Sequence, residues 1–461
     1  YRLYSTEVKT LDAVKLIEQL GYQEVNLFGV SNGTMGIQGF IRAAENSNIE
    51  IRSIYSDSNV PMKDYMRGDL GLLYKQILSQ ILDECANTPE CESRFKNLKK
   101  RFYAFLKSTL NDPLIYEGEK TIVFNTYEIN SVIHQLLYNH ANHKDIPLIL
   151  EAFMNNELEF IDLLLGRFQN LVETANGTSI INYVYDWKAR QPQVIKQYQQ
   201  IKKTHPEFLW ADFWLNFYTR DTTITYNPRD TIPVTSDVPA LVVAGTHDPV
   251  TAPVYSKMMH DRYSNSYYFE LPKLGHGVFV SECGRQLFNS FIEHPQEKPE
   301  DECVKELLLN PMSFTTSIYV NKKVSHLIQE ILAKRNVFWI IVLLLPLILS
   351  LIYVIRSIIR TIRKKKVNAL RLVLFLCIIM FLTGFVYYSH ETLSQGGLTF
   401  LFGLVEAAWW LPWCSAAISM FGIVILYRML KSLNFNFWNV SAILSTVLLL
   451  IAALTFDIYL F

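Results

Sequence analysis

Two hydrophobic patterns divide this sequence into a mixed part and an apolar part. Before about residue 337, short apolar runs such as 24–29, 239–245 and 266–271 alternate with segments of helical spacing such as 34–44. Short apolar strands separated by helices are typical of an α/β fold with a parallel sheet. After residue 336 the apolar runs become long enough to cross a bilayer.

The first apolar run ends in a glycine-flanked serine. The motif is Gly29-Val30-Ser31-Asn32-Gly33, and the helical pattern of residues 34–44 follows at once. A serine in a sharp strand-to-helix turn is typical of a nucleophile elbow, where the flanking glycines let the helix cross close to the strand. A glycine-rich connecting turn is the alternative interpretation of so short a motif. Ser31 is therefore a candidate nucleophile.

The next two apolar runs end in an acid and a base. Asp248 follows residues 239–245, and His276 follows residues 266–271. The order Ser, Asp, His is that of an α/β-hydrolase triad. A histidine must take the proton of the serine, and a buried carboxylate must orient the histidine. Alone, Asp248 before a proline is also a turn residue, and His276 between glycines is also a loop histidine, but the ordered set favours the triad.

Composition narrows the function further. Among the 461 residues, 43 are Lys or Arg and 43 are Asp or Glu, so bulk charge does not favour nucleic acid as a partner. His140 and His143 lie close together without a third ligand nearby, which predicts a solvated loop and no metal site. We expect no cofactor.

Four segments carry a family resemblance: LFGVSNGT, SIYSDSNVP, VPALVVAGTHDPVTAP and LPKLGHGVFVSECG. They resemble the tripeptidyl aminopeptidase and proline iminopeptidase branch of the α/β-hydrolases, over about residues 1–305. The resemblance implies Ser31 as nucleophile, Asp248 as acid, His276 as base and the backbone N–H of Asn32 as an oxyanion donor. It also implies a helical cap between strands and the release of residues or short peptides from free N-termini.

Two features depart from that family. Asn32 stands where the family often has Tyr, which makes the pocket wall smaller and more polar while keeping the backbone donor. The family's His-Gly-Gly-Pro-Gly loop, which supplies the second oxyanion donor, is absent, and the chain starts at Tyr1. We therefore expect an N-terminally truncated chain with a partial sheet. Losing an oxyanion donor costs about 10²–10³ in rate, so the chain as given is expected to be impaired.

Six cysteines fall into two groups. Cys85 with Cys91, and Cys283 with Cys303, each enclose a short segment, and the related aminopeptidases carry pairs at similar places. We expect two disulfides, which persist only in oxidising compartments; four reduced thiols are the alternative. The other two, Cys377 and Cys414, lie in apolar runs and are expected to be packing thiols.

The C-terminal part predicts four membrane spans: 337–355, 372–388, one within 398–427 and one within 440–461. Lys and Arg concentrate in two of the connecting loops: Arg356, Arg360, Arg363, Lys364, Lys365, Lys366 and Arg371 in one, Arg428 and Lys431 in the other. Basic loops stay in the cytoplasm, so the mixed part should lie outside. Glu406 and nearby tryptophans favour an interfacial belt over a polar site within the membrane.

The predicted architecture is a partial α/β-hydrolase sheet with a helical cap, followed by an all-α transmembrane region of about four helices. We expect core segments at 1–60 and 237–305, a cap at 61–236, a linker at 306–336 and spans at 337–461. The predicted function is an extracytoplasmic, membrane-anchored serine aminopeptidase with a peptide substrate and a lipid bilayer as partners. An esterase or lipase, or a non-catalytic ectodomain, is the alternative. A cap carboxylate that binds the substrate amine would distinguish them, with these candidates: Glu151, Glu157, Glu159 and Asp162.

Overall fold

The computed structural model describes residues 5–62, 70–117, 121–158, 160–161, 164, 191–208, 232–321, 323–332 and 334–458. The chain divides into two compact units, each considered separately below. The first comprises Tyr1–Leu158 with Gly166–Phe314, and the second comprises Glu159–Leu165 with Thr315–Phe461. The first unit holds the mixed α/β part of the sequence and the second holds the apolar helices.

A four-stranded parallel sheet forms the centre of the first unit, in the order β1-β2-β5-β6. Its strands are β1 (Glu24–Val30), β2 (Glu50–Asp57), β5 (Ala240–Gly245) and β6 (Ser266–Leu271). All six residues of β5 are buried, as expected for a strand covered on both faces. Because the strands are parallel, their carboxyl ends meet at one edge of the sheet, where ligands bind in such folds.

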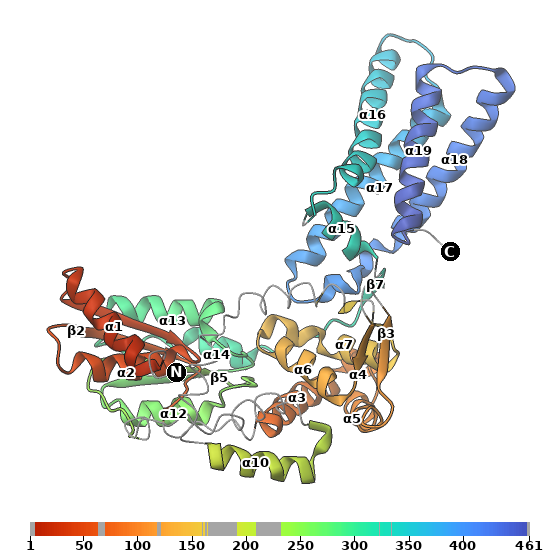
Figure 1. The fold of residues 1–461 in the computed structure, drawn as a ribbon. Helices are drawn as coiled ribbons and strands as arrows, with labels where there is room; N and C mark the ends of the chain where they lie inside the picture. The colour runs from red at the N-terminus through yellow and green to blue at the C-terminus, as the bar shows by residue number, and fades with distance from the viewer. Residues whose placement is uncertain are drawn as a thin grey trace. The chain divides into compact units, whose positions relative to one another are not determined.

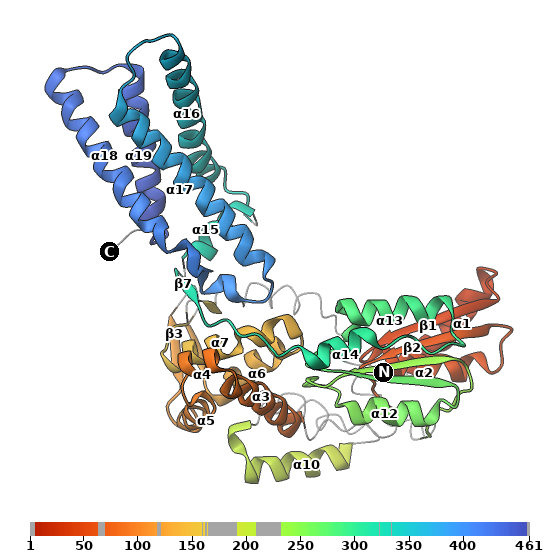
Figure 2. The ribbon, with the colours of Figure 1, turned by 180° about the vertical axis from the view of Figure 1, so that it is seen from behind.

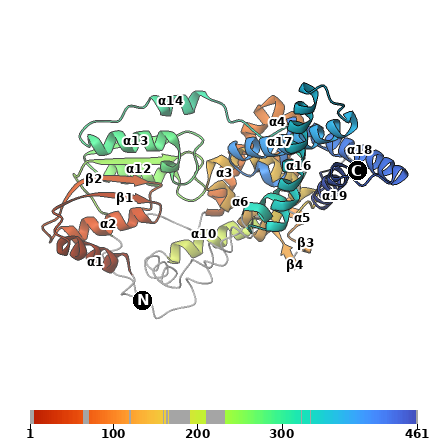
Figure 3. The ribbon, with the colours of Figure 1, turned by 90° about the horizontal axis from the view of Figure 1, so that it is seen from above.

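Helices cover both faces of this sheet. Leu287 and Phe291 of α13 pack against Tyr55 and Val243 on one face, and α14 joins the same cluster. The opposite face is covered by α2 and α12, and α1 packs on α2. Figure 3 shows α13 and α14 on one side of the sheet and α1 and α2 on the other. The bounds are α1 (Thr6–Gln19), α2 (Gly33–Ala44), α12 (Pro253–Arg262), α13 (Glu282–Glu293) and α14 (Glu302–Leu309).

The helix α1 starts at a serine cap: the hydroxyl of Ser5 accepts a hydrogen bond from the N–H of Val8 at 3.4 Å. A serine cap of this kind satisfies one of the unpaired donors of the first turn. The polar first turn that follows is therefore helical although it shows no apolar periodicity.

Along the chain, a mostly helical region connects β2 to β5, at the position where the sequence predicts a cap, and Figure 1 shows it beside the sheet. Its described elements are α3 (Leu70–Asn87), α4 (Pro89–Arg94), α5 (Leu98–Ser108), β3 (Leu114–Glu117), β4 (Thr121–Phe124), α6 (Thr126–Leu137), α7 (Ile146–Met154) and α10 (Gln191–Thr204). The hairpin of β3 and β4 was not expected from the sequence. The excursion explains how β2 and β5 pair although about 180 residues separate them.

Four long apolar helices form most of the second unit: α16 (Val337–Ile362), α17 (Ala369–Ser394), α18 (Leu411–Ser432) and α19 (Phe437–Thr455). Each is long and apolar enough to cross a membrane. They run alongside one another in Figures 1 and 2, and a shared core includes Phe375, Ile418 and Leu449. The predicted fold class, an α/β-hydrolase-like sheet followed by about four apolar helices, is confirmed.

The third apolar helix starts later than residue 398. A short β-strand, β8 (Gly403–Val405), pairs with β7 (Ile318–Val320), and the 3-10 turn η8 (Glu406–Trp410) comes before α18. The indole N–H of Trp410 donates to the hydroxyl of Tyr388 at 3.1 Å. Trp410 therefore packs inside the bundle, while Trp409 and Trp413 remain exposed as an interfacial belt would require. The segment expected to be a linker, 306–336, contains β7 and α15 (Val324–Leu332).

Candidate active site

Ser31 occupies a strained turn between β1 and α2. Its φ is 56°, a left-handed conformation that is costly for a residue other than glycine. A side chain at Gly29 would place its Cβ 2.8 Å from the carbonyl oxygen of Gly33 and from Ile37, so this glycine is required. The sequence predicts that both glycines let the helix α2 cross close to the strand β1. This prediction is wrong for Gly33, because a Cβ at Gly33 would have open space around it.

The backbone N–H of Asn32 is an available hydrogen-bond donor at the N-terminus of α2. The hydroxyl of Thr34 donates to the carbonyl of Ser31 at 2.7 Å and fixes the first turn of α2. In the described part of the chain, the N–H of Asn32 donates to no other group. An N–H at a helix N-terminus is suited to bind negative charge.

Asp248 and His276 form a direct pair. Nδ1 of His276 lies 2.8 Å from Oδ2 of Asp248. The carboxylate also accepts hydrogen bonds from the N–H groups of Val250 and Thr251 and from the Thr251 hydroxyl, at 2.7–2.8 Å. Because Nδ1–H donates to the carboxylate, Nε2 is the basic nitrogen of the ring, as a general base requires.

The electrostatics keep the Asp248 carboxyl ionised. Asp248 is fully buried, and burial alone would raise its pKa. The attraction of His276 and the hydrogen bonds from His276 and Thr251 outweigh burial, so the pKa of Asp248 lies below its ordinary value. A buried carboxylate held in this way orients and stabilises an imidazolium beside it.

Asp57, at the end of β2, connects the serine turn to the histidine loop. Its carbonyl accepts a hydrogen bond from the N–H of Ser31 at 2.9 Å. Its carboxylate accepts hydrogen bonds from the N–H groups of Val278 at 3.1 Å and Phe279 at 2.9 Å. The neighbouring Ser58 hydroxyl accepts from the N–H of Gly277 at 2.9 Å. One residue thus fixes Ser31 and the segment after His276 relative to each other.

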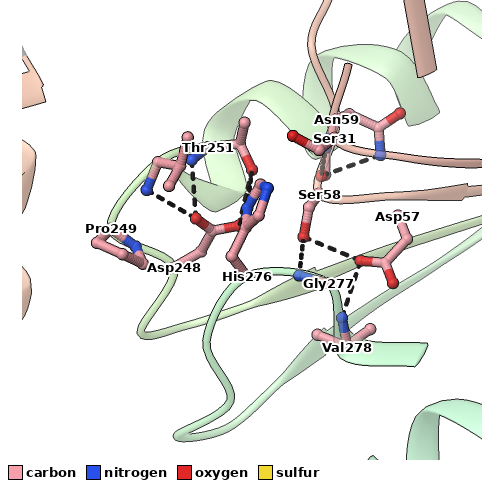
Figure 4. Close-up of polar contacts among 12 residues, drawn as sticks. Ser31, Asp57, Ser58, Asn59, Asp248, Pro249, Thr251, His276, Gly277 and Val278 are labelled. Atoms are coloured by element: carbon pink, nitrogen blue, oxygen red, sulfur yellow. Dashed lines mark hydrogen bonds and ion pairs between the residues drawn. The ribbon is translucent and has the colours of Figure 1, made fainter. Parts of the chain in front are cut away.

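Figure 4 shows this arrangement at the sheet edge: in this view the imidazole of His276 lies between Asp248 and Ser31. Burial raises the pKa of the Asp57 carboxyl to about 6, although the N–H groups of Phe279 and Val278 and the hydroxyl of Ser58 oppose the rise. Sequence reasoning did not single out Asp57 or Ser58. The available signal was a run of polar residues directly after a buried strand, next to the strand that carries Ser31.

The cap contacts the histidine loop through its backbone. The carbonyl of Tyr138 accepts a hydrogen bond from the N–H of His276 at 2.9 Å, and the two rings lie edge to face with centroids 5.1 Å apart. A Cβ at Gly275 would lie 2.6 Å from that carbonyl, and a Cβ at Gly245 would lie 2.3 Å from the carbonyls of Gly275 and Leu274. Both glycines are therefore required where β5, the loop and the cap cross.

The expectation of a solvated histidine loop is wrong for His143, which is 1% exposed. Its Nε2–H donates to the carbonyl of Leu137 at 2.9 Å, and its ring faces that of His247 at 5.8 Å between centroids. Burial lowers the pKa of His143 to about 4, so the ring is neutral at neutral pH. His247 also contacts Glu84 on α3, because its Nε2 lies 3.2 Å from the Glu84 carboxylate.

The candidate carboxylates of the cap differ in their surroundings. Glu151 forms ion pairs with Arg94 at 2.9 Å and with Arg101 at 3.3 Å. Glu157 is half-buried. Glu159 and Asp162 lie outside the described residues. Of the four, Glu151 is thus already neutralised by two arginines.

The cysteines lie as the sequence predicts. Cys85 is bonded to Cys91 and Cys283 to Cys303, which joins α3 to α4 and α13 to α14. Cys414 is buried and Cys377 is half-buried among the apolar helices.

The parallel sheet, the strained serine turn and the strand order define an α/β-hydrolase-like fold. The family model described as "TAP-like protein" matches residues 211–303, which include Asp248 and His276. A thermophilic esterase from Thermogutta terrifontis, solved with malate bound, aligns over 64% of this chain and 74% of its own, with 12% identity and a TM-score of 0.24. No curated protein matches the sequence.

Proposed function

We propose that this protein is a membrane-anchored serine hydrolase that works by acyl transfer. The observation that carries the proposal is the Asp248–His276 pair, 2.8 Å apart, at the same sheet edge as the strained turn of Ser31. Oγ of Ser31 attacks the carbonyl carbon of the substrate while Nε2 of His276 takes the hydroxyl proton. Asp248 holds the imidazole in the required tautomer and stabilises its cationic form.

The remaining steps use the same groups. The tetrahedral intermediate places its oxyanion near the N–H of Asn32, where a donor already in position stabilises developing charge. His276 then returns the proton to the leaving amine, and the bond to that amine breaks. Water, deprotonated by His276, attacks the acyl-enzyme and regenerates the Ser31 hydroxyl. The four residues of this cycle are the ones proposed from the sequence.

The substrate proposed is a peptide with a free N-terminus. The family resemblance and the match to the model described as "TAP-like protein" support an aminopeptidase. A substrate ammonium needs a carboxylate in the cap, and Glu151 is paired with Arg94 and Arg101. Among the candidates, Glu157 is the other carboxylate that the structure describes in the hydrolase unit, and we assign the role to it. The ion-paired state of Glu151 is the one observation that favours an esterase, which needs no such carboxylate.

The proposed location of the hydrolase unit is outside the cytoplasm. Two arguments support it independently. The basic loops of the apolar region favour the cytoplasmic side, which puts the chain before Val337 on the other side. The bonds Cys85–Cys91 and Cys283–Cys303 persist in oxidising compartments.

A fluorophosphonate probe tests the mechanism, because only an activated serine reacts with it. The full chain in membranes should be labelled, Ser31→Ala should not, and Ser290→Ala, an exposed serine on α13, should react like the unaltered chain. Absence of labelling in the unaltered chain would favour a non-catalytic ectodomain. Free and N-acetylated peptide anilides then separate the substrates: an aminopeptidase cleaves only the free form, and equal rates would favour an esterase or endopeptidase.

A further inference from the structure

One end of the apolar helix bundle carries uncompensated positive charge. Its basic residues are Arg356, Arg360, Arg363, Lys364, Lys365, Lys366, Arg371, Arg428 and Lys431. Residues 337–390 and 407–456 contain no Asp or Glu. No carboxylate of the described chain forms an ion pair with any of these side chains, so solvent ions or an anionic ligand must balance their charge.

Part of this charge lines a cavity between α16, α17 and α19. The open cavity has a volume of about 90 Å³ and is lined by basic and aromatic side chains, including Tyr353, Arg356, Arg360, Lys366, Arg371 and Trp438. The guanidinium of Arg356 lies 5.5 Å from the ring of Trp438, and that of Arg371 lies 5.8 Å from the ring of Tyr353. Cation–π contacts of this kind hold both arginines in place before any ligand arrives.

Arg371 also has an unused donor. Its Nη1 donates to the side-chain oxygen of Asn436 at 3.2 Å. Its Nε is buried and has no hydrogen-bond partner among the described residues. A buried donor without an acceptor is costly, and the cavity that Arg371 lines is where an acceptor would be supplied.

The position of the cavity along the helices limits what can fill it. The apolar stretch of α16 runs from residue 337 to residue 355, which at about 1.5 Å per residue spans roughly 28 Å, close to the hydrocarbon thickness of a bilayer. Arg356 and Arg360 follow this stretch directly. Arg371 and Trp438 lie in the first turns of α17 and α19, at the same end. In a bilayer this end lies at the depth of lipid headgroups.

We propose that this cavity binds the phosphate group of an anionic lipid headgroup. Arginine guanidinium groups bind phosphate through paired N–H···O bonds. Basic pockets between membrane helices are suited to anionic headgroups. The phosphate oxygens would supply the acceptor that Nε of Arg371 lacks and would neutralise charge that no carboxylate balances. Inorganic phosphate shares this chemistry, so the test must separate the two sources.

The experiment measures lipid retention by the full chain in detergent. Native mass spectrometry would follow titration with phosphatidylglycerol or phosphatidylcholine of identical acyl chains. The double variant Arg356→Gln/Arg371→Gln removes two charges from the cavity. Arg363→Gln/Lys364→Gln removes two exposed charges from the same loop outside it. A basic residue that contacts the anionic headgroup should strengthen association about fivefold, so the cavity variant should bind phosphatidylglycerol about 25-fold more weakly. The two control side chains do not line the cavity, so their loss should change binding far less.

Each outcome decides the proposal. Preference for phosphatidylglycerol that only the cavity variant loses supports it. Retention of phosphatidylglycerol in the presence of inorganic phosphate would support the lipid as the occupant. Loss of phosphatidylglycerol on addition of inorganic phosphate would instead identify free phosphate as the occupant. Equal retention of both lipids, or equal weakening by both double variants, would overturn it, since the charge would then act without a site. Arg356 is exposed, so Arg356→Gln alone, expected to weaken binding about fivefold, keeps the test valid if the Arg371 substitution prevents folding.

Discussion

Replacing Asp57 by Asn should separate catalysis from stability. The carboxylate of Asp57 accepts two backbone N–H donors from residues 278 and 279 and a hydroxyl from Ser58. An amide offers one oxygen, so one backbone donor would face an NH₂ group and lose its acceptor. The segment that follows His276 should then shift. A displacement of about 1 Å at a reacting group lowers the rate by about 10²-fold.

The effect on folding should be small because two contributions oppose each other. Raising the pKa from 3.8 to about 6 means that the ionised carboxylate is about 3 kcal/mol less favourable in the folded protein than in water. Asn removes that penalty. The unpaired backbone N–H costs about 1–3 kcal/mol. The free energy of unfolding should therefore change by no more than about 2 kcal/mol.

The pH dependence has a defined sign. Because its pKa in the folded state is raised, ionised Asp57 destabilises the folded protein above about pH 6. This stability is recovered as the pH falls from about 6 towards 3.8, the pKa of the carboxyl in the unfolded chain. Asp57→Asn should lose this dependence. Below about pH 6 the fluorophosphonate should label the unaltered chain more slowly, because a protonated Asp57 carboxyl binds the N–H groups of residues 278 and 279 less well.

The assay compares the fluorophosphonate labelling rate and the thermal midpoint of the full chain, with the exposed residue Asp237 changed to Asn as the matched control. The expected result is slow labelling and a nearly unchanged midpoint for Asp57→Asn, with neither change in the control. An unchanged labelling rate would refute the positioning role. A large loss of stability would show that the opposing contributions were weighed wrongly.

Two further changes test the site and its surroundings. Asp248→Asn should slow fluorophosphonate labelling by about 10⁴, as loss of the orienting carboxylate does in serine proteases; a rate near that of the unaltered chain would mean that another group orients His276. His143→Gln keeps a side-chain N–H for Leu137 but removes a group whose pKa is about 4 folded against 6.5 unfolded. Beside His247 and His140, the buried and neutral His143 ring should contribute about 2 kcal/mol of stability that is lost between pH 7 and pH 5. Denaturant unfolding at both pH values should show a smaller loss in the variant, and equal losses would contradict the assignment.

The sequence could predict features that depend on local pattern. The position of Ser31 followed from a strand and a helix meeting at glycines, and Gly29 is indeed required by the close approach of Gly33 and Ile37. Asp248 and His276 could be located because polar residues directly follow buried strands. The four apolar helices were predictable from length alone, since few soluble segments remain uncharged for so many residues.

Features that depend on distant contacts could not be predicted. The role of Asp57 depends on N–H groups about 220 residues away, which no spacing rule connects to it. His143 looks like a loop histidine in the sequence because the ring it packs against, His247, comes from a distant part of the chain. The cavity at Arg371 likewise requires three helices to meet, although its basic residues were visible as a topology signal.

The loop that carries His276 packs between β5 and the cap, and this packing limits which caps from other proteins could replace the present one. His276 is held from the cap side by a carbonyl of residue 138, and a main-chain carbonyl is supplied by any amino acid. Cap side chains can therefore diversify, and substrate preference with them, without disturbing the base. The restriction falls on the other partner: Gly275 and Gly245 have no room for a Cβ. A chimaera that keeps these two glycines and the path of the backbone at residue 138 should accept a foreign cap, whereas one that moves this backbone path would displace His276 even with every proposed triad residue present.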